Sequence, residues 1–290
     1  MRRFAVLLHR AIWRAFEHDA FVIAKAAAYS SILTLFPAFL VLASVLALSH
    51  KTSSAAIQIE MAIGRIMPPG TSKIALDYFA GNDSRRPTNV IISASIVMIL
   101  AASGVLISWM EGFRRAYLIS QNPWGFWKER GMALLLIPLS LIPLAFATFL
   151  VAFGSQIENW MSLHTFMELR PVLLFAWGLT RWVIATLTSI AVIALIYHMA
   201  VMRTQPWYKV LPGAYLVTAL WFPATLAFGW YVTKYANYAL IYGSLGAAIA
   251  LLVWLYMMSI IILIGAEFNA VVFPKTLSKV PQSGVSAASG

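Results

Sequence analysis

Six long stretches of this chain are apolar and almost free of charge, and they constrain the solvent in which it can fold. A helix needs about 20 mostly apolar residues to cross the hydrocarbon core of a bilayer. Arg181 is the one charged residue inside them, and His198 adds a second polar position. Most of the chain is therefore expected to face lipid rather than water. The stretches are residues 26–50, 87–110, 131–157, 171–202, 210–233 and 235–266.

The composition supports this expectation. Charged residues make up 11% of the chain and the mean hydropathy is +0.80, whereas a soluble protein carries about 25% charged residues. The formal net charge of +11 would suggest nucleic acid in a soluble protein. In a membrane protein, basic residues instead hold the ends of spans near anionic headgroups. The expected partners are therefore membrane lipids and not nucleic acid, and a homo-oligomer remains an open alternative.

The sequence offers no pattern for a metal, cofactor or catalytic site, so the chain is not expected to be an enzyme. It contains no cysteine, which excludes disulfides and thiolate chemistry. Its five histidines show neither the i, i+4 pairing nor the HExxH motif of zinc sites. A Walker A sequence and a GxGxxG fingerprint are also absent.

These patterns predict an all-α integral membrane protein with one membrane domain over residues 1–274 and a disordered cytoplasmic tail at 275–290. Apolar residues at i, i+3 and i+4 between residues 3 and 18 predict an amphipathic helix in the headgroup plane, or packed on the end of the bundle. Short helices on the outer surface are expected between residues 51 and 87. Prolines inside the first, third and fifth spans are expected to kink them. The six spans are predicted at residues 26–49, 90–110, 132–154, 172–198, 212–233 and 243–273.

The distribution of basic residues predicts that both termini are cytoplasmic. With the N-terminus inside, 13 of the 21 Lys and Arg residues fall on the inner side. The bias strengthens when the long connection after the first span is given less weight, because long loops cross regardless of charge.

Ionisable residues near membrane depth are the candidates for a polar site, because such charges usually face the protein interior and have partners. Lys25 opens the first span and Glu267 lies near the end of the last, so the predicted topology brings them together, directly or through Tyr29 or Asn269. That contact could join the helices or form a substrate or proton site. Arg181 lies deep in the fourth span, where it could reach outward to the interface or bind an anion.

A basic group follows the second span. Glu111 and Arg115 are spaced i, i+4, which indicates an ion pair at a helix end. Alternatively, the cationic side chains could bind lipid headgroups on the cytoplasmic side. The candidates for headgroup contact are Arg114, Arg115, Lys128 and Arg130.

Several segments in order resemble the YihY/BrkB family of bacterial inner-membrane proteins. They run from Lys25-Ala-Ala-Ala-Tyr-Ser-Ser to Pro37, through Ser103-Gly104-Val105 and Phe113-Arg114-Arg115-Ala116-Tyr117, and on to Leu211-Pro212-Gly213-Ala214, Ile241–Ala247 and Gly265-Ala266-Glu267-Phe268-Asn269-Ala270. The resemblance implies six spans in the cytoplasmic membrane and no settled activity. It also implies links to serum resistance and envelope lipid traffic, and some members carried a ribonuclease label. The chain departs from the family pattern at Ser30 and at Ile119-Ser120.

Two functions remain open from the sequence. The first is transport or translocation of a lipid or amphipathic anion in the bacterial envelope, motivated by charges and prolines inside the bundle. The second is a structural or interaction protein in which the same charges only join helices. A nuclease is not expected, because no clustered carboxylates for a two-metal site stand outside the spans.

Overall fold

The computed structural model describes residues 2–48, 87–119, 124–164, 170–201, 205–234 and 245–274. Every secondary-structure element within these ranges is an α-helix, and six helices are long and apolar enough to cross a membrane. The predicted all-α class with six spans is therefore confirmed. The expected short surface helices and the tail lie outside the described residues. The helices are α1 (Arg2–Glu17), α2 (Ala20–Leu48), α5 (Pro87–Ala116), α6 (Gly125–His164), α7 (Arg170–Ala200), α8 (Trp207–Lys234) and α10 (Leu245–Val272).

The helices continue through their prolines. Pro37 lies inside α2, Pro138 and Pro143 inside α6, and Pro223 inside α8. Each proline removes one backbone donor, which a transmembrane helix tolerates when neighbouring groups satisfy the freed carbonyl. The prolines therefore do not divide the spans into separate helices.

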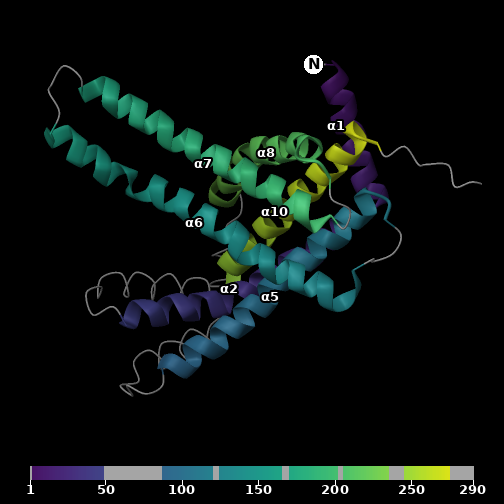
Figure 1. Ribbon diagram of the computed structural model, residues 1–290, viewed down its shortest axis with the longest axis horizontal. Helices are drawn as coiled ribbons and strands as arrows, with labels where there is room; N and C mark the ends of the chain where they lie inside the picture. Colours follow the sequence, from purple (N-terminus) through teal and green to yellow (C-terminus); the bar gives the residue numbers. More distant parts are fainter. Residues whose placement is uncertain are drawn as a thin grey trace, which may run out of the picture.

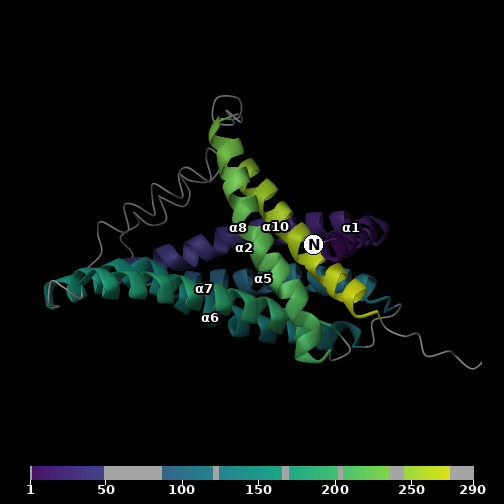
Figure 2. The same ribbon diagram turned by 90° about the horizontal axis from the view of Figure 1, so that it is seen from above.

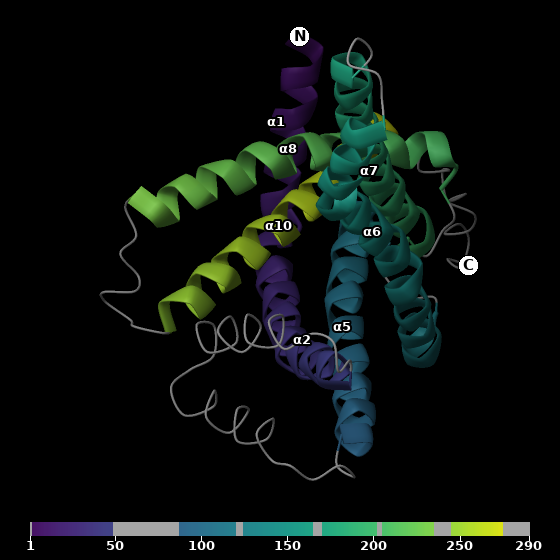
Figure 3. The same cartoon turned by 90° about the vertical axis from the view of Figure 1, so that its left-hand side faces the viewer.

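The six long helices form three pairs that diverge from a common base. The pairs are α2 with α5, α6 with α7, and α8 with α10. Figures 1 and 2 show the pairs pointing apart, and Figure 3 looks onto their diverging ends. We use "base" for α1 together with the first turns of α2, α6 and α8 and the last turns of α5, α7 and α10. The chain thus returns to the base after each pair, and both described termini lie there.

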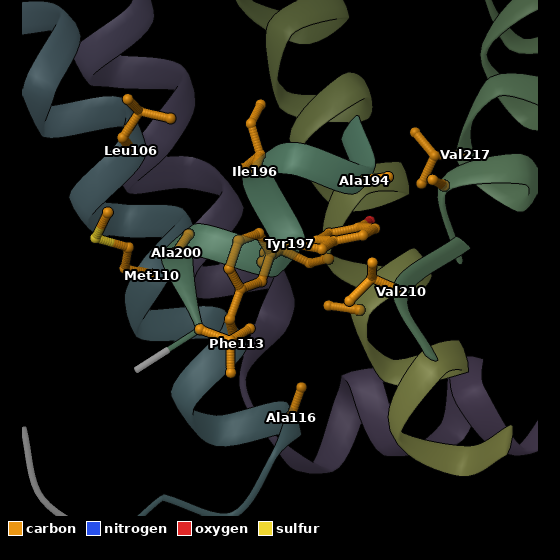
Figure 4. Packing of buried hydrophobic residues seen from close by; sticks show 14 of the residues in the cluster. Leu106, Met110, Phe113, Ala116, Ala194, Ile196, Tyr197, Ala200, Val210 and Val217 are labelled. Carbon is orange, nitrogen blue, oxygen red and sulfur yellow. The ribbon is translucent and has the colours of Figure 1, made fainter. Parts of the chain in front are cut away.

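The tightly packed core is close to the base (Figure 4). Met110, Phe113, Tyr197 and Val210 are fully buried. The rings of Phe113 and Tyr197 meet edge to face with centroids 5.2 Å apart, and the Tyr197 hydroxyl donates a hydrogen bond to the Ile262 carbonyl at 2.5 Å. Lipid is as apolar as these side chains, so close packing and hydrogen bonds, rather than removal from water, hold the helices together.

Glycines permit the closest helix contacts in this core. A Cβ at Gly112 would collide with the Leu263 side chain, and one at Gly213 would collide with the Gly265 carbonyl and the Asn269 side chain. A Cβ at Gly104 would lie 3.1 Å from the Ser30 hydroxyl. The segments that carry the family resemblance therefore contact one another across the bundle.

Some apolar side chains of helix α1 pack against the protein, and others are exposed. Ala11 and Ala15 are buried, and Phe4 meets Phe268 of α10 with ring centroids 5.7 Å apart. Trp13 and Phe16 are 62% and 60% exposed. The predicted amphipathic helix is confirmed, and it packs on the end of the bundle while it keeps an apolar side free.

Candidate functional site

A buried carboxylate lies at the centre of the base. Glu267 of α10 is 1% exposed, and its Oε1 lies 2.5 Å from His18 Nδ1 while its Oε2 lies 3.4 Å from Arg14 Nε. Burying a carboxylate is costly unless charged or hydrogen-bonding partners compensate for the lost water. Oε2 accepts no hydrogen bond within the described residues, so this end of the carboxylate depends on the arginine. The three residues tie α1 and the following turn to the last helix.

The predicted contact of Lys25 with Glu267 is wrong. Lys25 is exposed and Tyr29 is 62% exposed. The two residues share a helix face, as their spacing predicts, but α2 turns its alanine-rich face toward the core. That buried face carries Ala20, Ile23, Ala24, Ala27 and Ala28, and it leaves the face with Lys25 and Tyr29 pointing outward.

Sequence reasoning missed Arg14 and His18 as the partners of Glu267. Both residues belong to the amphipathic helix predicted between residues 3 and 18, and neither is paired with Glu267 on the basis of sequence. Their i, i+4 spacing on one helix face was the available signal. Only the packing of α1 across the end of α10 shows that this face turns toward the protein.

Asn269 joins α10 to α8 through two buried hydrogen bonds. The Gly213 N–H donates to Asn269 Oδ1 at 2.6 Å, and Asn269 Nδ2 donates to the Val210 carbonyl at 3.1 Å. Pro212 stands beside these groups and has no N–H of its own. A side-chain amide supplies both a donor and acceptor, so Asn269 can satisfy both backbone groups at once.

Tyr117 completes the polar cluster just beyond α5. Burial, reinforced by the nearby Glu267 charge, raises the pKa of the Tyr117 phenol well above its usual range, and a hydrogen bond with Asn269 opposes this shift. The phenol therefore stays protonated at physiological pH. We call Arg14, His18, Tyr117, Glu267 and Asn269 the base cluster.

The basic residues after the second span pair with acids. Arg115 Nε lies 3.0 Å from Glu111 Oε1, and its Nη1 lies 2.7 Å from Asp19 Oδ2. Arg114 also pairs with Glu111. The predicted helix-end ion pair is confirmed, and pairs this exposed contribute at most about 1 kcal/mol each. Asp19 adds a link to the α1–α2 turn that the spacing did not predict.

The other candidates for headgroup contact lie at the start of α6. Lys128 is exposed, with its Nζ 5.7 Å from the centre of the Trp124 ring, and Arg130 is partly buried. Contact of these residues with lipid headgroups stays a prediction.

Arg181 lies far from the base cluster. It is half-buried on α7, sixteen residues before Tyr197, which is about 24 Å along the axis at 1.5 Å per residue. Trp182 beside it is 55% exposed. The residues grouped by sequence as one polar site are thus divided. Glu267 and Asn269 lie at the base, and Lys25 and Tyr29 face outward. Arg181 lies on the diverging part of α7. Within the described ranges, no three His, Asp or Glu side chains come close enough to hold a metal ion.

These features define a multi-pass α-helical membrane protein with a buried polar cluster at one end. The model of the family described as virulence factor BrkB matches residues 11–287. The chain belongs to this family, and the predicted resemblance is confirmed.

Three relatives of known sequence illustrate this similarity. A UPF0761 membrane protein of Tolumonas auensis is 30% identical over 281 residues, covering 93% of this chain and 85% of that protein. A UPF0761 membrane protein of Pseudoalteromonas atlantica is 25% identical over 84% of this chain and 78% of its own length. The putative ribonuclease-like protein YfkH of Bacillus subtilis is 29% identical over 62% of this chain and 65% of that protein. No solved structure matches.

Proposed function

We propose that this protein translocates a lipid or an amphipathic anion in the bacterial cytoplasmic membrane. The observation that carries the proposal is the divergence of the three helix pairs away from the base. Their far portions expose large apolar side chains that no other described helix covers, such as Ile96, Phe146, Phe175 and Phe222. An amphipathic molecule could enter sideways between pairs that separate in this way, with its apolar part in lipid.

Arg181 supplies a cationic group in the diverging region. A charge at membrane depth is costly unless it faces water, protein or an anion, and this arginine is half-buried on α7. A guanidinium binds phosphate and carboxylate groups with two parallel hydrogen bonds. It is therefore suited to an anionic headgroup that passes along α7.

Lipid flux in reconstituted vesicles tests the proposal. Vesicles containing fluorescent phosphatidylglycerol in both leaflets would be treated with a membrane-impermeant quencher, for the wild type, Arg181→Ala and the adjacent control Thr180→Ala. We expect flux above that of empty vesicles for the wild type and the control, and a reduced flux for Arg181→Ala. Background flux in every sample would exclude transport, and equal flux in every variant would remove the role of Arg181.

The alternative is a structural or interaction protein, and the base cluster favours it. Glu267 is paired internally with Arg14 and His18, so these groups could serve only to hold α1 on α10. A charge swap, Arg14→Glu with Glu267→Arg, separates a structural role of the base cluster from a role of the cluster in transport. Recovery of both stability and flux by the swap favours a structural link, whereas a stable protein without flux indicates a transport role for the cluster.

We also propose that the chain is not an enzyme. A separate proposal is that both termini are cytoplasmic. The common position of the described termini at the base, together with Arg14, Arg114, Arg115 and Lys128, supports this orientation through the positive-inside rule. Accessibility of single cysteines to an impermeant reagent in intact cells would test this orientation of the termini.

A further inference from the structure

A groove of about 690 Å³ runs between α1 and the end of α10 at the base. We propose that it binds the phosphate of an anionic phospholipid headgroup. Binding at this groove is separate from the proposed transport, since it requires only that α1 lie at the membrane surface. The groove is lined by His9, Arg10, Trp13, Arg14, Val271 and Pro274.

The charge of the lining points to an anion. Two arginines and a histidine line the groove, and none of its lining residues within the described part of the chain is a carboxylate. Within the described part of the chain, neither His9 nor Arg10 forms an ion pair with an acid. The charge of Arg10 and the hydrogen-bonding groups of both side chains are therefore available to a ligand.

Arg14 is held in position beside them. Its Nε lies 3.4 Å from Glu267 Oε2, and its Nη2 donates a hydrogen bond to the Ala116 carbonyl at 3.1 Å. A guanidinium has five N–H donors, more than these two contacts use. The buried carboxylate thus fixes an arginine whose remaining donors can face the groove. Arg10 and Arg14 are spaced i, i+4 on α1, so the two guanidinium groups can reach one phosphate.

The apolar part of the lining distinguishes a lipid from a free anion. Trp13, Val271 and Pro274 offer carbon surface next to the cations. The indole N–H of Trp13 donates to Glu17 Oε1 at 2.8 Å, which orients the ring along α1. Indole rings favour the boundary between headgroups and acyl chains. The side chains of Trp13 and Phe16 are largely exposed on the apolar side of α1. A phospholipid would fill both parts, whereas inorganic phosphate would use only the cations.

Native mass spectrometry of the protein released from phosphatidylcholine nanodiscs with added phosphatidylglycerol tests the site. Arg10→Gln removes one cation from the groove, and Arg3→Gln removes the same charge from the same helix away from the lining. We expect Arg10→Gln to weaken retention of phosphatidylglycerol about tenfold, as for the loss of one charge-assisted hydrogen bond. Arg3→Gln should leave retention close to the wild type.

Two further arms identify the ligand. Phosphatidylcholine should be retained more weakly than phosphatidylglycerol by the wild type, and millimolar inorganic phosphate should not displace the lipid. Equal retention of the two lipids, displacement by phosphate, or equal losses in the two variants would overturn the proposal. The comparison of lipids on the wild type needs no variant, so it decides the matter even if Arg10→Gln fails to fold. If the lipid binding is absent but flux is intact, the groove proposal fails and the proposed transport stands. If flux is at background but the lipid binding is intact, the proposed transport fails and the groove proposal stands.

Discussion

Replacing Asn269 with alanine removes both links between α10 and α8 at the base. The substitution takes away the acceptor for the Gly213 N–H and the donor to the Val210 carbonyl. Both backbone groups lie in a buried part of the bundle, and Gly213 itself is buried. No water is expected to replace the lost partners, because the neighbouring side chains pack closely around them.

The expected loss of stability follows from these two bonds. A buried backbone group left without its partner costs about 1–3 kcal/mol, so two such groups cost about 2–6 kcal/mol. The Gly213 N–H can partly recover by turning toward a carbonyl of its own helix. We therefore expect a loss of about 3 kcal/mol in the free energy of unfolding, near the middle of that range.

Thermal unfolding of the purified protein in detergent measures this loss, and the 11 tryptophans provide the fluorescence signal. At about 2–4 °C per kcal/mol for a chain of this size, Tm should fall by about 6–12 °C. Thr218→Ala on α8 is the control, because its hydroxyl donates only to the Ala214 carbonyl one turn earlier. Asn269→Asp should be at least as damaging as Asn269→Ala, since it places an acceptor against the Val210 carbonyl. A loss for Asn269→Ala no larger than that for Thr218→Ala would refute the bridging role.

Three other outcomes follow from the structure. Glu267→Gln should lower Tm by several degrees, because it leaves the Arg14 cation without its anion, about 3 kcal/mol for a broken buried pair, and alters the hydrogen bond with His18. Exposed Lys25→Gln should leave Tm unchanged, and a Tm loss confined to Lys25→Gln would restore the contact predicted from sequence. Gly213→Ala should destabilise the protein by about 1–3 kcal/mol through overpacking. Gly229→Ala on the same helix, where a Cβ meets open space, should leave stability unchanged. Similar effects of the two substitutions on Tm would contradict the close approach of α8 and α10. Single cysteines in α1 and in the last turn of α10 should react with an impermeant reagent from the same side of a vesicle, and a result on opposite sides would exclude the common base.

The sequence by itself determined the class of protein. Hydropathy alone is enough to recognise apolar stretches of membrane-crossing length. In a bilayer each such span forms a helix, because its backbone hydrogen bonds must be made within the span itself. The same local logic located α1, whose apolar period is visible without knowledge of its neighbours. The family resemblance likewise rested on short local segments, and the comparisons confirmed it.

The partners of buried polar groups were decided only by tertiary structure. Sequence reasoning paired Glu267 with Lys25 because both were expected at similar depth, yet depth does not fix rotation about a helix axis. The alanines of α2 pack inward and turn Lys25 away, while α1 crosses α10 and brings Arg14 and His18 to the carboxylate. The bridge from Asn269 to Gly213 likewise joins two residues that are 56 positions apart in sequence, and it depends on the close approach of the backbones of α8 and α10. Such contacts arise from side-chain packing across the whole bundle, which no local pattern encodes.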